Sequence, residues 1–410
     1  MKWWFRQQLH TQIGICIVIG IGLGFFLGPR SAVIQPVGDI FIRLLKMLIV
    51  PLTFFTLVNG ITKMEDLRSL RSVGGMTLLY YTATSLFAAT VGMIVAFIIR
   101  PGSRVLGILD SGVHVKTTDF NLIENIVSWV PTNPVQAMAS ADMLPVIVFS
   151  IIVGVCLLSM KQKTDGLRNV INEGTDLFIS MTGFVMKFAP YGILALIANM
   201  VGTMSVSMLS EIGRFILSDA VAIVFILTVV YPILLIFLGK RNPLRFYRNV
   251  APAMLVAAST TSSSATLPVS MKVAANNLGL PERIYGFTLP LGMTINMDGM
   301  AASLGVIAVF ASNLYGVPIT ASHIFQFMFL GLVLSIGTAG IKGSGVIMST
   351  VLLQTLDMPL TLIPILAAVW PIIDIAHTTC NITGDLTGST IIGSRLGVMD
   401  EEIFNGRNGM

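Results

Sequence analysis

Ser259-Thr260-Thr261-Ser262-Ser263-Ser264-Ala265-Thr266-Leu267-Pro268 lies within residues 249–271, a stretch that contains no Asp, Glu, Lys or Arg. A second polar run, Ser335-Ile336-Gly337-Thr338-Ala339-Gly340-Ile341-Lys342-Gly343-Ser344-Gly345, begins inside the uncharged stretch 299–341. Hydroxyl and glycine runs leave backbone groups without helical partners, which at membrane depth is tolerated only inside protein or beside a water-filled cavity. Both runs therefore predict re-entrant hairpins whose tips meet inside the protein.

The composition of the whole chain agrees with a membrane location. Of 410 residues, 25 are Lys or Arg and 20 are Asp or Glu, so 11% are charged and 54% are hydrophobic. A soluble domain has about 25% charged residues, so an ordinary cytosolic enzyme is excluded, as are disorder, collagen and coiled coil. The three cysteines are far apart in apolar segments and suggest neither a disulfide framework nor a zinc site. The chain is predicted to be an all-α integral membrane protein.

Uncharged stretches locate the membrane spans. Five of them are expected to cross as helices: 7–29, 72–99, 143–160, 188–210 and 220–239. A further helix at about 33–62 contains three charges but is long enough to span at a tilt. Basic residues gather at the N-terminus and in the loops at 63–71, 161–168 and 240–248, although the outer loop near 100–118 also carries three. By the positive-inside rule we expect cytoplasmic N- and C-termini in an inner (plasma) membrane, and no nucleic-acid binding.

Each polar hairpin is followed by an apolar helix that contains an Asn-x-x-Gly pattern. The first pattern is Asn296-Met297-Asp298-Gly299, and the second is Asn381-Ile382-Thr383-Gly384 followed by Asp385. Broken helices in corresponding positions of two repeats indicate the midplane site of a transporter. We therefore predict inverted repeats with two broken helices.

Three aspartates, Asp298, Asp374 and Asp385, are embedded in this apolar sequence without a Lys or Arg in the surrounding spans. On insertion scales each costs roughly 2.5–3.5 kcal/mol at a helix centre. Sodium, a substrate ammonium group or a proton would supply the missing positive charge. The alternative is that these carboxylates cap broken helix ends or are protonated.

A hydroxyl patch on the third helix provides further oxygen atoms. Tyr81, Thr84 and Ser85 share one helix face because their spacing is three and four residues. Together with the carboxylates and the amides of Asn296 and Asn381, they form an oxygen-rich set that suits sodium. The alternative is that the hydroxyls bond back to carbonyls of their own helix.

The serine hairpin, the Asn296 break, the second hairpin and the Asn381–Asp385 motif, in this order and spacing, resemble the glutamate transporter family, the dicarboxylate/amino acid:cation symporters. The resemblance implies eight transmembrane helices plus two re-entrant hairpins, with helices 7 and 8 broken. It also implies a homotrimer whose scaffold is formed by residues 1–71 (helices 1 and 2) and 101–210 (helices 4 and 5). Residues 72–100 (helix 3) and 211–410 (helix 6, both hairpins, helices 7 and 8) would form a mobile, elevator-type transport domain.

The resemblance implies three sodium sites, so Na⁺ is the expected cofactor. The first would use Asp385, the Asn381 region and carbonyls near Asn296. The second would use carbonyls of Ser335, Ile336 and Thr338 with the Thr294 region. The third would use Tyr81, Thr84, Ser85, Asn296 and Asp298.

The resemblance also assigns a site for a small amino acid substrate. Asp374 would take its ammonium group, and Thr378 and Asn381 its main chain. Ser263 and Ser264 would hold the α-carboxylate with N–H and O–H donors at a hairpin tip. The alternative is that these serines only cap the hairpin helices.

Four residues depart from the acidic-substrate members of the family. His377 stands where they carry an arginine clamp, and Met300 where they carry threonine. A further arginine is replaced by Thr261 or Ile375. Neutral histidine and methionine are poor carboxylate ligands, so the sequence favours a neutral or larger polar amino acid. The alternative is a sodium- or proton-coupled aspartate/glutamate or dicarboxylate symporter in which a bound carboxylate keeps His377 protonated.

Two other classes compete with a transporter. An intramembrane aspartyl protease requires a Gly-x-Gly-Asp signature, and here Ile382 occupies the first glycine position. A channel would need a selectivity filter, and no stretch of the sequence resembles one. We therefore expect a secondary symporter and not an enzyme.

Overall fold

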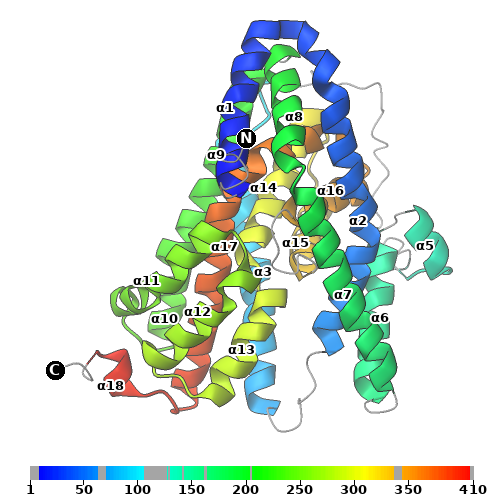
Figure 1. The fold of residues 1–410 in the computed structure, drawn as a ribbon. Coiled ribbons are helices and arrows are strands. Elements are labelled where there is room, and N and C mark those ends of the chain that lie inside the picture. Colours follow the sequence, from blue (N-terminus) through cyan, green and yellow to red (C-terminus); the bar gives the residue numbers. More distant parts are fainter. Residues whose placement is uncertain are drawn as a thin grey trace, which may run out of the picture.

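The computed structural model describes residues 9–62, 71–105, 127, 130–140, 143–160, 164–203, 206–336 and 344–406. These residues form helices joined by turns, and no strand occurs among them, which agrees with the predicted all-α class (Figure 1). Large apolar side chains remain exposed on the outer faces of several helices, as expected for a surface that contacts lipid. Examples are Phe25, Phe26, Leu79, Ile98 and Phe237.

One group of helices comes mainly from the N-terminal half. Its members are α1 (Leu9–Leu27), η2 (Gly28–Ile34), α2 (Gln35–Thr62), α5 (Pro134–Ser140), α6 (Met143–Met160), α7 (Asp165–Met186) and α8 (Ala189–Thr203). Helix α1 packs along α8, and α2 packs against α6, α7 and α8 (Figure 1). The close approach of α1 to α8 requires small residues, since a Cβ at Gly24 would lie 2.7 Å from the Ala198 carbonyl oxygen.

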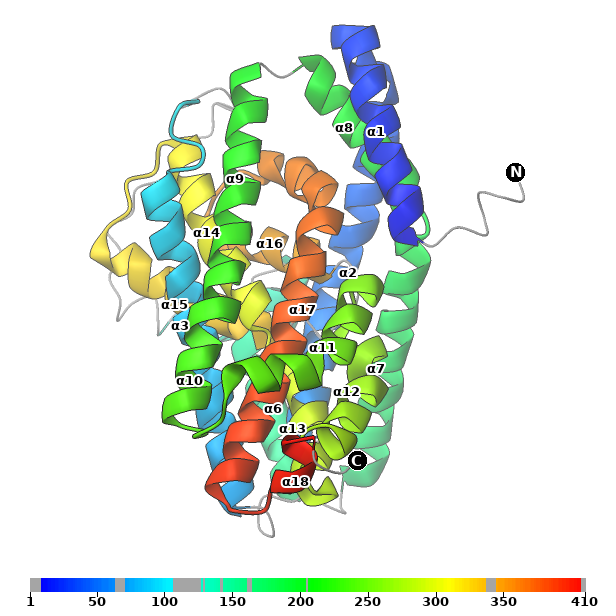
Figure 2. The ribbon, with the colours of Figure 1, turned by 90° about the vertical axis from the view of Figure 1, so that its left-hand side faces the viewer.

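The second group contains the predicted functional residues. Its members are α3 (Arg71–Ile99), α9 (Val206–Phe225), η4 (Ile226–Val230), α10 (Tyr231–Phe237), α11 (Pro243–Thr260), α12 (Ser263–Asn276), α13 (Glu282–Ile295), α14 (Asp298–Tyr315), α15 (Ala321–Ile336), α16 (Ser344–Thr355), η5 (Leu360–Leu362), α17 (Ile363–Arg395) and α18 (Glu401–Phe404). Helices α3, α9 and α14 lie side by side, and α17 packs against all three (Figure 2). The almost fully buried α14 is the centre of this group.

Five segments of the described chain are long and apolar enough to cross a membrane: Thr11–Leu44, Val73–Ile99, Ser207–Phe237, Glu282–Tyr315 and Leu360–Arg395. A sixth is added if Asp165–Val185 and Ala189–Thr203, which meet at 53°, form one bent span. A multi-pass membrane protein is thus supported, while the predicted arrangement of eight spans stays a prediction.

The predicted boundaries of two spans were wrong. Instead of helices at 188–210 and 220–239, α8 ends at Thr203, and a new helical segment runs from Val206 through η4 and α10 to Phe237. The uncharged-stretch criterion missed its first half because Glu211 and Asp219 lie there. Both are buried and have partners inside the protein, which lowers the cost of carrying them in an apolar helix.

The serine run forms a helical hairpin, whose re-entrant placement in the membrane stays a prediction. Helices α11 and α12 pack against each other and are joined by Thr261, in the left-handed conformation (φ 48°), and Ser262. The Ser262 side chain accepts a hydrogen bond from the Ala265 N–H and caps α12. The second predicted hairpin corresponds to α15 and α16, and its connection at 337–343 lies outside the described residues.

Only one of the two predicted helix breaks is present. Helices α13 and α14 are interrupted at Asn296 and Met297, whose ψ angles are 76° and 60°. By contrast, α17 is continuous through Asn381–Asp385, so the predicted break in helix 8 was wrong. The hydroxyls of this region bond to carbonyls of their own helix, as Thr383 does to Thr379, and therefore leave the helix intact.

Candidate cation and substrate site

Asp298 is the centre of a buried cluster at the helix break. It lies in the first turn of α14 and is 0% exposed. Its Oδ1 accepts a hydrogen bond from the Ser85 hydroxyl at 2.9 Å, and its Oδ2 accepts one from the Tyr231 hydroxyl at 2.8 Å. The Thr84 hydroxyl lies 3.2 Å from Oδ1 of Asn296. Side chains of α3 and α10 thus converge on the break, and Thr84, Ser85, Asn296 and Asp298, four of the predicted sodium ligands, lie together there.

Tyr231 was not predicted as part of this site. It is fully buried and also donates to the Cys380 carbonyl at 3.2 Å. The five-residue π-helical segment η4 directly precedes it; such segments change the register of a helix and are frequent at functional sites. In the sequence, a single tyrosine in an apolar span gives no signal that separates this role from ordinary packing.

Asp385 forms the neighbouring part of the cluster. It is 1% exposed, and its Oδ1 accepts a hydrogen bond from Asn296 Nδ2 at 2.9 Å. Asn296 therefore bridges the two aspartate regions, with its amide oxygen toward Thr84 and its amide nitrogen toward Asp385. A Cβ at Gly292 would contact Asp385 Oδ1 and lie 2.7 Å from the Tyr81 hydroxyl, so glycine is needed for this packing. Tyr81 donates to the Thr288 carbonyl at 2.8 Å.

The donor set of the cluster fits a small hard cation. Within the described ranges, neither Asp298 nor Asp385 forms an ion pair with a basic side chain, and each is bonded to hydroxyl or amide groups. The same ranges contain no group of three or more His, Cys, Asp or Glu residues that could hold a metal. Carboxylate, hydroxyl and amide oxygens are ligands that hard cations prefer, so this chemistry suits sodium better than a transition metal.

The predicted second sodium site is only partly described. The hydroxyls of Ser335 and Thr294 bond to the carbonyls of Leu332 and Leu291 in their own helices. Ile336 ends α15, and Thr338 lies outside the described residues. This set therefore stays a prediction.

Helix α17 brings the predicted substrate residues together. Asp374 is half-buried, whereas His377, Thr378 and Asn381 are buried. Oδ1 of Asn381 accepts a hydrogen bond from the Gly299 N–H at 2.8 Å, which ties α17 to the helix break. Helix α17 therefore links the predicted substrate residues directly to the candidate cation cluster, which consists of Thr84, Ser85, Tyr231, Asn296, Asp298 and Asp385.

The remaining predicted substrate residues lie near the ends of their helices. Met300 is buried two residues into α14. Ser263 and Ser264 occupy the first two positions of α12, and the N-terminus of a helix is a favourable place for an anion.

His377 has a partner that the sequence analysis missed. Its Nε2 lies 2.8 Å from Oδ2 of Asp219 on α9, and both side chains are 1% exposed. In the alternative interpretation of the sequence the carboxylate facing His377 comes from the substrate, whereas in the structure the carboxylate of Asp219 contacts the ring. The sequence analysis took the uncharged residues 220–239 as the membrane span. Asp219 directly precedes this stretch and was therefore left outside the predicted span.

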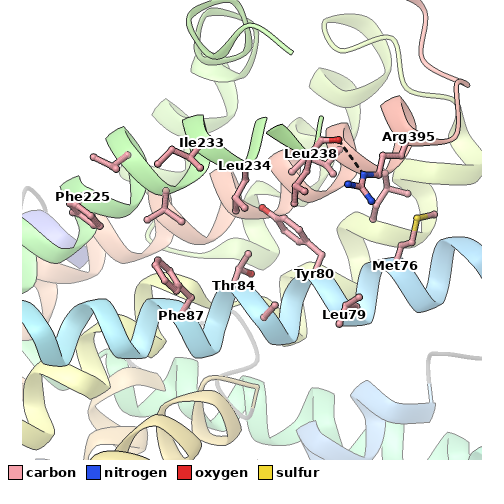
Figure 3. Close-up of a pocket in the computed structure, with 15 residues that line it drawn as sticks. Met76, Leu79, Tyr80, Thr84, Phe87, Phe225, Ile233, Leu234, Leu238 and Arg395 are labelled. Atoms are coloured by element: carbon pink, nitrogen blue, oxygen red, sulfur yellow. Dashed lines mark hydrogen bonds between the residues drawn. The ribbon is translucent and has the colours of Figure 1, made fainter. Parts of the chain in front are cut away.

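The apolar groove in Figure 3 is separate from the substrate residues. It has a volume of about 450 Å³ and lies between α3, the η4–α10 segment and the end of α17. Tyr80, Thr84 and Phe87 point from α3 toward Ile233 and Leu234 (Figure 3). Thr84 thus lies between the groove and the cation cluster.

Comparison with known proteins extends over almost the whole chain. The profile of the "Sodium:dicarboxylate symporter family" matches residues 9–395. The chain belongs to this family. The "Proton/sodium-glutamate symport protein" of Geobacillus stearothermophilus is 30% identical over 405 residues, which cover 96% of each chain. The "Proton/glutamate-aspartate symporter" of Escherichia coli (strain K12) is 32% identical, covering 94% of this chain and 92% of the relative.

A third relative is named for a different class of substrate. The "C4-dicarboxylate transport protein" of Laribacter hongkongensis (strain HLHK9) is 27% identical and covers 97% of this chain and 91% of its own. The predicted family and the cation-coupled symporter class are therefore confirmed. The substrates in these names are acidic, which supports the alternative interpretation of the sequence over a neutral or polar amino acid.

Proposed function

We propose that this sodium:dicarboxylate symporter family member is a sodium- or proton-coupled symporter of aspartate, glutamate or a C4-dicarboxylate, with His377 in place of an arginine clamp. The observation that carries the proposal is the buried cluster in which Asn296 contacts Thr84 and Asp385 beside Asp298. Two buried carboxylates without a basic partner in the described chain favour cation binding, because an uncompensated charge is costly at membrane depth.

The substrate lies along α17 in this proposal. Asp374 takes the ammonium group of an amino acid substrate, and Thr378 and Asn381 hold its main chain. The first turn of α12, at Ser263 and Ser264, receives the α-carboxylate through backbone N–H groups. The side-chain carboxylate points to His377.

The proposed coupling follows from charge compensation. Substrate and cations together neutralise the buried aspartates, so a partly filled site carries uncompensated charge and cannot cross the membrane readily. Because Asn381 is bonded to the helix break at Gly299, substrate binding on α17 affects the backbone beside the cation cluster. The hairpin formed by α15 and α16 closes the substrate site on its extracellular side.

The proposed movement is of the elevator type, with eight spans and two re-entrant hairpins. Residues 1–71 and 101–210 form the scaffold of a homotrimer, while residues 72–100 and 211–410 carry the site. The packing supports a division close to this one, because α1, α2 and α6–α8 contact mainly one another, as do α3 and α9–α17. The boundary between the two groups lies just before α9, which begins at Val206. Both termini lie in the cytoplasm, and the protein resides in the plasma membrane.

Uptake by purified protein in liposomes tests the function. We expect an inward sodium or proton gradient to drive saturable accumulation of radiolabelled aspartate, glutamate or succinate, and asparagine to compete weakly. Asp298→Asn should lower cation-driven uptake strongly. Glu173→Gln, which alters an exposed carboxylate on α7, serves as the control. Uptake of neutral amino acids alone, or equal uptake without any cation gradient, would contradict the proposal.

A further inference from the structure

In the Asp219–His377 pair, each side chain uses only one of its two hydrogen-bonding atoms. Nε2 and Oδ2 are 2.8 Å apart, but Nδ1 of His377 and Oδ1 of Asp219 are buried and have no hydrogen-bond partner among the described residues. A buried polar atom without a partner is costly, and such atoms in a folded protein call for a specific reason. One reason is that a ligand completes the bonding.

The surroundings of His377 point to the substrate as that ligand. His377 lies three residues after Asp374, next to Thr378, and its ring packs against Trp370 with a centroid distance of 5.4 Å. The Trp370 Nε1 is likewise buried without a partner in the described chain. The indole also contacts Gly345 at the start of α16, where a Cβ would collide with the ring. Two nitrogen atoms without partners in the described chain therefore belong to two contacting rings on α17, the helix that carries the predicted substrate residues.

We infer that Asp219 is a positioning residue: it holds Nε2 of His377, so that Nδ1 meets the side-chain carboxylate of the substrate and acidic substrates are selected. The inference rests on the proposed function and adds a residue from a different helix to it. With both ring nitrogens protonated, one N–H donates to Asp219 and the other to the substrate. The indole N–H of Trp370 is a second donor for the same carboxylate.

Charge balance gives Asp219 a second effect, on the cost of the empty subsite. A protonated His377 paired with Asp219 is neutral overall, so the empty subsite adds little net charge to the membrane interior. Without Asp219, the imidazole would lose its fixed orientation and its compensating charge. Loss of a hydrogen bond to a charged group lowers binding affinity about 10- to 100-fold.

Liposome uptake at constant pH and saturating sodium tests the inference. KM and maximal rate are measured for aspartate and for its neutral isostere asparagine. Asp219→Asn should raise the KM for aspartate about 10- to 100-fold, change the KM for asparagine less, and retain sodium dependence. Asp219→Glu keeps the carboxylate and should give an intermediate KM. Because Asp219 acts through His377, Asp219→Asn should add little in a His377→Asn background.

Glu211→Gln is the matched control. Glu211 is a fully buried carboxylate on the same helix, but it accepts the Gly102 N–H at 2.6 Å instead of facing His377. We expect its substitution to leave the aspartate-to-asparagine ratio of KM values unchanged, even if the protein is less stable.

The outcomes separate the inference from the proposed function. If wild-type protein transports aspartate but Asp219→Asn leaves the KM ratio unchanged, only the inference is overturned. If wild-type protein takes up no acidic substrate, both are overturned. Should Asp219→Asn fail to fold, Asp219→Glu decides, since an unchanged KM in that variant would show that the ring position does not matter.

Discussion

Gly384→Ala is the sharpest perturbation of the cation cluster. A Cβ at Gly384 would lie 2.5 Å from the Tyr231 hydroxyl and 3.1 Å from both Asn296 Nδ2 and Asp298 Oδ2. Ordinary contacts of a Cβ begin at 3.4 Å, so the hydroxyl must retreat by about 0.9 Å. If the hydroxyl moves directly away from the Cβ, its distance to Asp298 Oδ2 grows from 2.8 Å to about 3.2 Å, the long end of the hydrogen-bonding range.

The expected cost follows from two contributions. Overpacking a buried site costs about 1–3 kcal/mol, and lengthening the hydrogen bond forfeits part of the about 1.5–3 kcal/mol that a bond to a charged group contributes. Replacing a helical glycine by alanine returns about 0.4–1 kcal/mol. The net destabilisation should therefore be about 1–4 kcal/mol, and sodium affinity should fall at least tenfold because Tyr231, Asn296 and Asp298 must all shift.

Thermal unfolding of detergent-solubilised protein, titrated with sodium at constant ionic strength, measures both effects. We expect Gly384→Ala to unfold at a lower temperature without sodium and to need at least ten times more sodium for half of the stabilisation. Gly183→Ala is the control, because a Cβ at this α7 position meets no atom within 4 Å; its unfolding temperature should be equal or higher. Unchanged stability and sodium affinity in Gly384→Ala would refute the assignment of the cluster.

Three further predictions concern single side chains. Asp385→Asn should weaken sodium affinity about 10- to 100-fold, since a carboxylate bonded to Asn296 becomes a neutral amide; an unaltered sodium titration would contradict this. Ser85→Ala removes one hydrogen bond to Asp298 and should lower sodium affinity by a smaller factor, about 3- to 10-fold, measured in the same titration. Outside the membrane, the hydrogen bond from Arg241 lowers the pKa of Glu401. The charged form therefore stabilises the fold above about pH 4.5, and this contribution is lost as the pH falls through the lowered pKa. Because Glu401 is 57% exposed, Glu401→Gln should cost less than about 1 kcal/mol at pH 7, and the difference from wild type should disappear at strongly acid pH; a difference that grows on acidification would contradict the pairing.

The hairpin and the first helix break could be predicted because each depends on local sequence. The first hairpin helix ends where Thr261 adopts the left-handed conformation, and Ser262 caps the second helix, which begins at Ser263. Asn296 and Met297 leave the helix where Asp298 begins the next one. The hydroxyls of Thr84 and Ser85 share a helix face, and this face is the one that meets Asn296 and Asp298.

The break predicted at Asn381 is absent, because the Asn-x-x-Gly residues there contact neighbouring elements and do not end the helix. Gly384 allows α17 to approach Tyr231, and the Asn381 side chain bonds to the backbone at Gly299. Local sequence cannot separate a glycine that ends a helix from one that lets two helices pack closely. That difference depends on the neighbouring element.

The partners Tyr231 and Asp219 could not be predicted because both act through long-range contacts. Asp219 and His377 are 158 residues apart, and Tyr231 and Asp298 are 67 apart. A charge such as Asp219 lowers the apolarity of its segment, so the hydropathy pattern moved the helix boundary instead of identifying a buried pair. Only the fold shows that the charge has a partner.

The most direct test of a cation-coupled symporter is cation movement driven by the substrate. Purified protein in liposomes is given an inward aspartate gradient with equal sodium and pH on both sides, and entry of ²²Na⁺ and acidification of the lumen are recorded together. We predict that aspartate drives sodium or protons inward until their internal concentration exceeds the external one, and that Asp385→Asn suppresses the sodium component. Aspartate entry with no accompanying movement of either cation would contradict the proposed mechanism.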